Sequence, residues 1–185
     1  MLRTPLVLLV ATLLAPLATA AEPGAGWAYM NHDVRRLHSD ETVNLRARYA
    51  GQPLLIINTA SFCGFSGQFR KLEALHQEYR ERGLKVVGFP SDDFKQEAAE
   101  EKKTAEVCYK NYGVSFDMYQ PVGVRGKDAH PVFQELARQA GAPRWNFYKY
   151  VVDRQGRVVA QFPSQVEPDA AEVRTAIDQA LQSKP

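Results

Sequence analysis

Two cysteines, Cys63 and Cys108, are the only thiols in the 185-residue chain. A cysteine sulfur reacts with peroxides and disulfides as a thiolate, and it forms a disulfide with a second cysteine. A structural bridge between these two would close a loop of 45 residues and would contribute about 4 kcal/mol on a chain-entropy estimate. The pair alone therefore supports either a catalytic redox couple or a permanent structural disulfide.

Cys63 lies between a predicted strand and a predicted helix. Residues 54–59 (LLIINT) form a short apolar run typical of a buried strand. Apolar residues then recur at helical spacing from Gln68 to Arg82, and Gly83 is a typical helix stop. A helix start stabilises a thiolate by about 0.3–2 kcal/mol, whereas lowering a thiol pKa from about 8.5 to about 6 requires on the order of 3.4 kcal/mol. Further hydrogen-bond donors are therefore needed around the sulfur.

The elements that follow predict the fold. Residues 84–89 form a second buried strand, so residues 54–89 make a strand–helix–strand unit with a right-handed crossover. The remaining segments predict a solvent-facing helix over residues 95–110, a helix over 131–140 opened by Pro131, a hairpin of residues 148–153 and 157–162, and a closing helix over 169–182. This order is that of a thioredoxin-like α/β fold with a central mixed sheet flanked by helices. Residues 31–45 predict a β-hairpin before it.

Three segments, in order, resemble the signatures of the glutathione peroxidase family. They are residues 58–65 (NTASFCGF), residues 88–97 (GFPSDDFKQE) and residues 145–153 (WNFYKYVVD). The resemblance extends from about Val43 to the C-terminus. It implies a peroxidase (EC 1.11.1) that reduces hydrogen peroxide or organic hydroperoxides with a cysteine or selenocysteine. No cofactor is implied.

The resemblance also implies a catalytic set of Cys63, Gln96, Trp145 and Asn146. An indole N–H and two carboxamides are uncharged donors, which stabilise a thiolate and orient a peroxide without adding an acid. The second signature departs from the family pattern, because one residue separates Phe94 from Gln96 where two are usual. The Glu-Ala-Ala that follows indicates helix where the family has a turn.

In Cys-dependent members of that family a second cysteine lies on the helix after the second signature, and Cys108 matches it. Attack of the Cys63 thiolate on a hydroperoxide yields a sulfenic acid and releases water or an alcohol. Cys108 would then form a Cys63–Cys108 disulfide, which a thioredoxin-like protein or glutathione would reduce. If the two cysteines start far apart, the helix carrying Cys108 must unwind or swing.

The N-terminus has the pattern of a secretory signal peptide. Arg3 precedes an apolar run over residues 6–17, and the small residues Ala18-Thr19-Ala20 follow. This run is shorter than the ~20 residues needed to span a bilayer. We therefore expect a signal peptide at residues 1–20, a linker at 21–26 and one domain at 27–185 without stable membrane insertion. The location would be periplasmic or secreted, where an oxidising environment demands a dedicated electron supply.

Composition and motifs exclude other classes. The balance of 23 basic and 21 acidic residues gives no reason to expect a nucleic-acid partner. No metal site is expected, since zinc-site spacing is absent from the four histidines, His32, His38, His76 and His130. The alternatives are a thioredoxin-like envelope disulfide oxidoreductase and a non-catalytic binding domain with a structural disulfide. Ser66 and Gly67 argue against the first, because they occupy the positions of its usual second cysteine.

Overall fold

The computed structural model describes residues 25–184, and a mixed five-stranded sheet forms its centre. β3 is parallel to β4 and β4 to β5, whereas β6 runs antiparallel to both β3 and β7. The predicted thioredoxin-like order is therefore confirmed. Across the sheet the strands are β5 (Asp117–Met118), β4 (Lys85–Pro90), β3 (Leu54–Thr59), β6 (Lys149–Val152) and β7 (Val158–Phe162).

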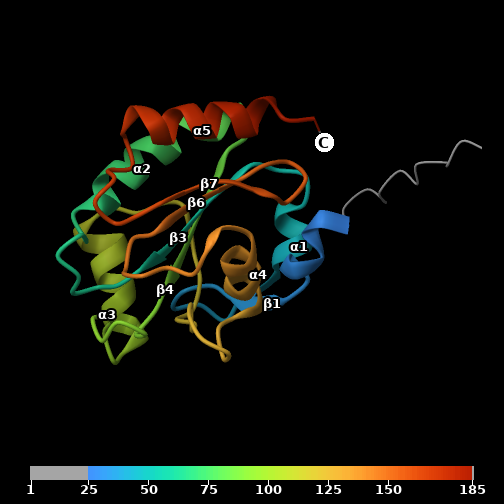
Figure 1. Cartoon of the computed structure of the whole chain (residues 1–185). Helices are drawn as coiled ribbons and strands as arrows, with labels where there is room; N and C mark the ends of the chain where they lie inside the picture. The colour runs from blue at the N-terminus through green and yellow to red at the C-terminus, as the bar shows by residue number, and fades with distance from the viewer. Residues whose placement is uncertain (1–24, 185) are drawn as a thin grey trace, which may run out of the picture.

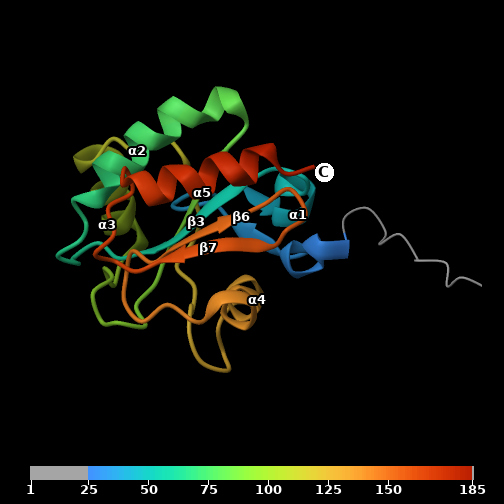
Figure 2. The same cartoon turned by 45° about the horizontal axis from the view of Figure 1, so that its top comes forward.

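Helices cover both faces of this sheet, as Figures 1 and 2 show. α2 (Gln68–Tyr79) and α5 (Ala171–Gln182) lie side by side on one face, and α4 (Pro131–Ala140) lies on the other. A 3-10 helix, η2 (Arg80–Arg82), extends α2 to Gly83. Each face has its own apolar core, and every residue of β3 is buried between them. Both cysteines belong to the core on the α2 side.

An N-terminal β-hairpin precedes the sheet, as predicted. It consists of β1 (Asp33–Arg35) and β2 (Thr42–Asn44), which pair antiparallel and lead into the short helix α1 (Leu45–Tyr49). A 3-10 helix, η1 (Ala25–Met30), comes before the hairpin, so the last two residues of the expected linker are folded. The expected signal peptide, residues 1–20, lies outside the described residues. None of the helices within residues 25–184 is long and apolar enough to cross a membrane.

The solvent-facing helix predicted over residues 95–110 is wrong in its first half. The chain turns irregularly as far as Glu100, and helix begins only at α3 (Glu101–Ala105). The cause is local competition for backbone N–H groups, because the N–H of Ala98 donates to Glu97 Oε1 at 2.6 Å and that of Glu97 donates to Asp92 Oδ1 at 3.3 Å. Nor is the segment simply solvent-facing, since its second half turns several side chains into the core: Thr104, Ala105, Val107 and Cys108.

A π-helix, η3 (Glu106–Asn111), continues from α3 and carries Cys108. π-Helices are rare and occur mostly as single turns, which are frequent at functional sites. The continuous α-helix expected around Cys108 is therefore replaced by two short pieces with different hydrogen-bond registers.

Candidate active site

Cys63 lies in the turn that joins β3 to α2, at the edge of the sheet where β3 and β4 end. Its side chain is buried, with 3% of the residue exposed, and its carbonyl accepts a hydrogen bond from the N–H of Ser66 at 2.9 Å. Gly67 is the N-cap of α2, so Cys63 lies outside the helix, ahead of its first turn. Because the dipole effect falls off within that turn, the helix contributes less to the thiolate than the sequence indicated.

Two cationic side chains near Cys63, those of Arg70 and Lys71, bind partners at the surface. The guanidinium of Arg70 stacks over the ring of Tyr112 at 5.1 Å, and Lys71 forms ion pairs with Asp169 at 3.1 Å and Glu167 at 3.4 Å. Both side chains are therefore held by these surface contacts. Stabilisation of a Cys63 thiolate therefore depends on uncharged donors.

Gln96 and Asn146, the two predicted carboxamides, are in direct contact. The Nδ2 of the fully buried Asn146 donates to Gln96 Oε1 at 3.1 Å. The backbone N–H of Phe62, the neighbour of Cys63, donates to the carbonyl of Gln96 at 2.9 Å. The loop that is one residue shorter than the family pattern therefore still delivers Gln96 to the cysteine turn.

Trp145 lies at the surface of the same site, with 37% of the residue exposed. Its ring packs against that of Phe94 with centroids 5.3 Å apart, and its carbonyl accepts from Asn58 Nδ2 at 3.1 Å. Within residues 25–184 no acceptor is recorded for the indole N–H. That donor is therefore available to a ligand.

Asn58, in β3, holds the loop that carries Trp145 and Asn146. Its carbonyl accepts from the N–H of Phe147 at 2.7 Å, and its side-chain oxygen accepts from that of Tyr148 at 3.1 Å. The sequence offered no functional signal for this residue beyond its place in the first signature. Its three bonds to the loop make it the direct link between the strand before Cys63 and the Trp-Asn segment.

Cys108 is also buried, with 1% of the residue exposed, and both cysteines are free thiols. Burial, reinforced by the charge of Glu97, raises the pKa of the Cys108 thiol to about 12. Cys108 is therefore a protonated thiol at neutral pH in this conformation. It needs a different environment before it can act as a nucleophile.

Glu97 connects the cysteine turn to the helix that leads to Cys108. Its Oε1 accepts from the hydroxyl of Ser61 and from that of Thr104, the latter at 2.9 Å. Ser61 is two residues before Cys63, and Thr104 is four residues before Cys108. Sequence reasoning missed this contact, because the Glu-Ala-Ala run indicated a solvated helix.

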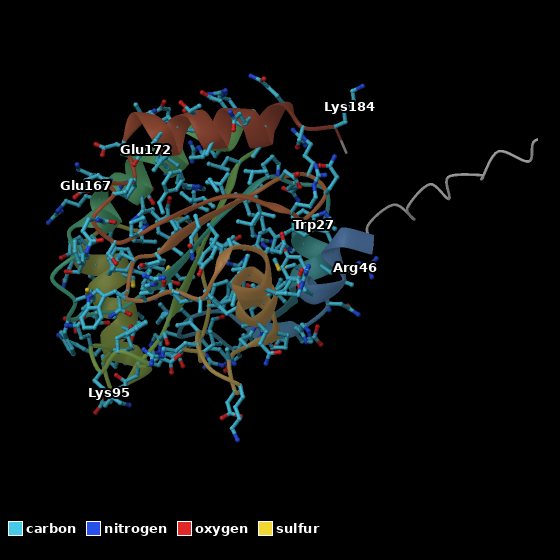
Figure 3. The ribbon with its side chains drawn as sticks, in the orientation of Figure 1. Trp27, Arg46, Lys95, Glu167, Glu172 and Lys184 are labelled. Carbon is cyan, nitrogen blue, oxygen red and sulfur yellow. The ribbon has the colours of Figure 1, made fainter. Side chains whose placement is uncertain are left out.

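The surface around Cys63 combines apolar and charged groups. Phe62 is 60% exposed, and a hollow of about 190 Å³ lies next to the turn, lined in part by Gly64, Phe65 and Gly67. Figure 3 places Lys95 and Glu167 at this edge of the molecule and Trp27 at the opposite one. The turn that carries the thiol is therefore apolar at Phe62 and lies beside the charged side chains of Lys71 and Glu167.

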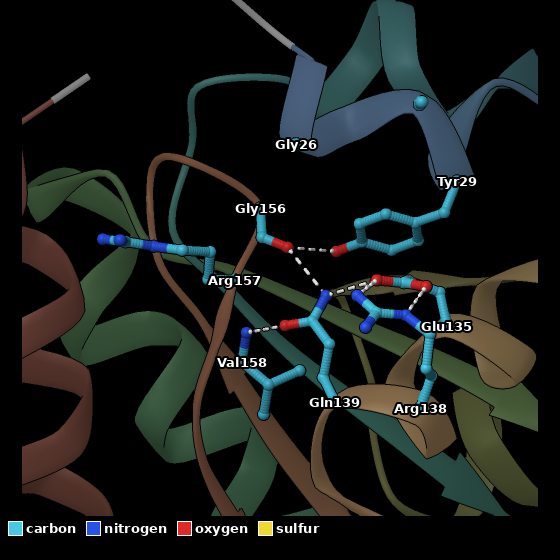
Figure 4. A pocket seen from close by; sticks show the side chains of 9 residues that line it. Gly26, Tyr29, Glu135, Arg138, Gln139, Gly156, Arg157 and Val158 are labelled. Carbon is cyan, nitrogen blue, oxygen red and sulfur yellow. Dashed lines mark hydrogen bonds and ion pairs between the residues drawn. The ribbon is translucent and has the colours of Figure 1, made fainter. Parts of the chain in front are cut away.

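A larger hollow of about 840 Å³ lies elsewhere, between η1, α4 and the β6–β7 turn (Figure 4). Its charged side chains are already paired, Arg138 with Glu135 at 2.6 Å and Arg157 with Asp153 at 2.8 Å. In the described part of the chain, no cluster of three or more His, Cys, Asp or Glu residues is placed to hold a metal ion. We therefore place the chemistry at the cysteine edge.

Comparisons with known proteins show the family to which the chain belongs. The family model of glutathione peroxidase matches residues 30–137. A glutathione peroxidase of Lactococcus lactis subsp. cremoris is 42% identical over 138 residues, which cover 71% of this chain and 87% of the relative. A glutathione peroxidase-like peroxiredoxin, gpx1 of Schizosaccharomyces pombe, is 41% identical over 128 residues, which cover 66% of this chain and 81% of the relative.

Solved structures give the same family and fold. The crystal structure of Trgpx in apo form has a TM-score of 0.65 and 27% identity, covering 84% of this chain and 95% of that one. Mycobacterium tuberculosis DsbF, at 12% identity and a TM-score of 0.59 over 82% of this chain and 96% of its own, shares the fold alone. The chain therefore belongs to the glutathione peroxidase family and is a peroxidase built on the thioredoxin-like fold.

Proposed function

We propose that Cys63 reduces hydrogen peroxide or organic hydroperoxides, with Gln96, Trp145 and Asn146 as hydrogen-bond donors around its sulfur. The observation that carries the proposal is the hydrogen bond between Asn146 and Gln96, next to the bond that joins Gln96 to Phe62. Together they join the segments of Asn146 and Gln96 to the turn that carries Cys63. The three proposed donors are uncharged, so they favour a thiolate without protonating it.

The first step oxidises the sulfur by two electrons. The Cys63 thiolate attacks the terminal oxygen of the hydroperoxide, the S–O bond forms, and the O–O bond breaks. The released hydroxide or alkoxide takes up a proton and leaves as water or an alcohol. The exposed Phe62 ring suits an apolar group on the hydroperoxide.

In the second step Cys108 resolves the sulfenic acid. Its thiolate attacks the Cys63 sulfur, the S–S bond forms, and the S–O bond breaks, with the hydroxide and the thiol proton leaving as water. The buried, protonated state of Cys108 requires that η3 first unwinds. The π-helical register of this segment supports such a role, because it is a less favourable backbone arrangement than an α-helix.

The cycle closes when a thiol donor reduces the Cys63–Cys108 disulfide. One thioredoxin-like dithiol supplies both electrons, since its first thiolate forms a mixed disulfide and its second releases the reduced protein, whereas glutathione requires two molecules. The peroxiredoxin relative and a resolving cysteine favour the dithiol. Because Phe62 is exposed beside Cys63, the disulfide would form next to an apolar contact surface for a protein reductant.

Thiol counting tests this function. The reduced protein is mixed with one equivalent of hydrogen peroxide or cumene hydroperoxide, and free thiols are titrated after quenching. We expect both thiols to disappear within seconds and mass spectrometry to find the Cys63 and Cys108 peptides joined. Retention of both thiols after many minutes in excess peroxide would contradict the proposal.

We further propose export with cleavage after Ala20, which rests on the pattern of residues 1–20. Expression of the full chain in a Gram-negative host, followed by osmotic-shock fractionation, tests it. The mature protein is expected in the periplasmic fraction with Ala21 as its first residue. Full-length protein confined to the cytosol, with secretion of a matched signal-bearing control intact, would reject export.

A further inference from the structure

Lys149 is a fully buried lysine at the start of β6, just after the Trp-Asn-Phe segment. Its ammonium donates to the carbonyl of Phe147 at 2.7 Å and to Gln68 Oε1 at 3.0 Å. Among the described residues no carboxylate lies within ion-pair distance of it. An unpaired buried charge is costly, so its position calls for an explanation beyond packing.

Phe147 has an unusual backbone. Its φ of 64° lies in the left-handed region, which costs a residue other than glycine about 1–2 kcal/mol. Three contacts hold it there: its N–H donates to Asn58, its carbonyl accepts from Lys149, and its ring packs on Phe69 with centroids 5.2 Å apart. Since Trp145 and Asn146 directly precede Phe147, this conformation sets the direction of both.

The second contact of Lys149 continues into a hydrogen-bonded chain. Gln68, the first residue of α2, donates from Nε2 to the carbonyl of Ser164 at 2.6 Å. The Ser164 hydroxyl donates in turn to the carbonyl of Asn146 at 2.5 Å. The ammonium of Lys149 is thus the shared donor of two paths, one through Phe147 and one through Gln68 and Ser164, that both end at the Trp-Asn segment.

We propose that Lys149 is a positioning residue for the peroxidase reaction, whose buried ammonium holds Trp145 and Asn146 in the orientation that serves Cys63. It acts through the Phe147 carbonyl and Gln68, and it does not touch the substrate. The proposal rests on the proposed function of Cys63. The orientation of the Trp145 and Asn146 donors matters because small displacements of catalytic groups lower the rate about 100-fold.

The charge of Lys149 gives the proposal a pH signature. Burial lowers the pKa of the lysine to about 8, and the nearby Glu167 opposes this shift. The other charged groups on this side are Lys71 and Asp169, which are paired with one another, Lys71 also pairing with Glu167. As the pH rises through about 8, Lys149 loses its proton and its donors weaken, so the oxidation rate per Cys63 thiolate should fall.

The experiment measures the second-order rate of Cys63 oxidation by hydrogen peroxide from pH 6 to 10, with the thiolate fraction followed by ultraviolet absorbance. The variants are Lys149→Met, Lys149→Arg and the control Lys127→Met, which removes an exposed lysine. All are made in a Cys108→Ser background, so that one thiol is followed. We expect Lys149→Met to slow oxidation per thiolate about 10- to 100-fold and to lose the fall above pH 8. Lys149→Arg should recover part of the rate and also lack the fall, and Lys127→Met should match its parent.

The outcomes separate this inference from the proposed function. If the parent protein itself does not react with peroxide, the proposed function fails. If the parent reacts and folded Lys149→Met reacts equally fast, the positioning role is refuted. A slow Lys149→Met beside a parent whose rate per thiolate does not fall above pH 8 also refutes it, since packing alone would explain the loss. If Lys149→Met does not fold, the parent's pH profile and Lys149→Arg decide.

Discussion

Replacing Cys63 by serine is expected to lower the rate of hydroperoxide reduction by at least about 10³-fold, because the attacking atom is lost. A serine hydroxyl is not ionised at neutral pH and does not accept an oxygen atom from a peroxide. Serine is close to cysteine in size, so the buried turn around residue 63, whose side chain is 3% exposed, should keep its fold. The loss is therefore chemical and not structural.

Thiol titration after peroxide addition measures this effect, with circular dichroism to verify the fold. The variant retains Cys108, whose burial and raised pKa should keep its thiol intact under the same exposure. Ser66→Ala is a matched control, since it alters a neighbouring side chain of the same turn whose only recorded hydrogen bond is to Tyr112. If the Cys63→Ser protein still consumed peroxide at the parent rate, another residue would have to carry out the reaction.

Replacing Cys108 by serine is expected to have a different result. The first oxidation of Cys63 should keep its rate, while steady-state turnover with a thioredoxin-like reductant should fall about 100-fold or more. The reason is that no internal thiol remains to convert the sulfenic acid into a disulfide. The acid should then accumulate, react with dimedone, and proceed to the sulfinic acid in excess peroxide.

Stopped-flow kinetics and mass spectrometry separate the two phases of this variant. Undiminished turnover with glutathione would identify direct resolution by the small thiol. Undiminished turnover with the protein dithiol would contradict a resolving role for Cys108. In the parent protein, hydrogen exchange should report faster exchange across η3 in the disulfide form than in the reduced form. Equal protection in both forms would count against unwinding.

Much of the fold could be predicted from the sequence, because the strongest signals are periodic. β3 and α4 have the predicted bounds, since a compact apolar run and a proline-opened amphipathic segment each leave little choice. The brief elements α1 and β5 were not predicted, because five and two residues are too few to establish a period. Tertiary contacts fix them instead, as when Tyr49 and Tyr119 share a hydrogen bond of 2.6 Å between their hydroxyls.

The candidate site, like the fold, was predictable from the sequence only in part. Cys63, Gln96, Trp145 and Asn146 were predicted from residue types in ordered signatures, and the structure places the two carboxamides in contact. The polar residues beneath them were not identified. Whether a lysine such as Lys149 lies in solvent or in a core depends on its partners, here a main-chain carbonyl and the side chain of Gln68. No spacing rule in the sequence encodes those partners.

The π-helix also bears on how far Cys108 can travel. Its six residues, Glu106–Asn111, occupy about 9 Å of axis even at the α-helical rise per residue, and fully extended they span about 20 Å. Melting this one turn thus releases a tether roughly 10 Å longer than the folded segment, at the loss of the hydrogen bond that the N–H of Val114 donates to the carbonyl of Cys108. Unwinding η3 would therefore let the Cys108 sulfur move further than the folded segment allows. Shortening η3 by one residue should restrict that movement while leaving Cys63 unchanged.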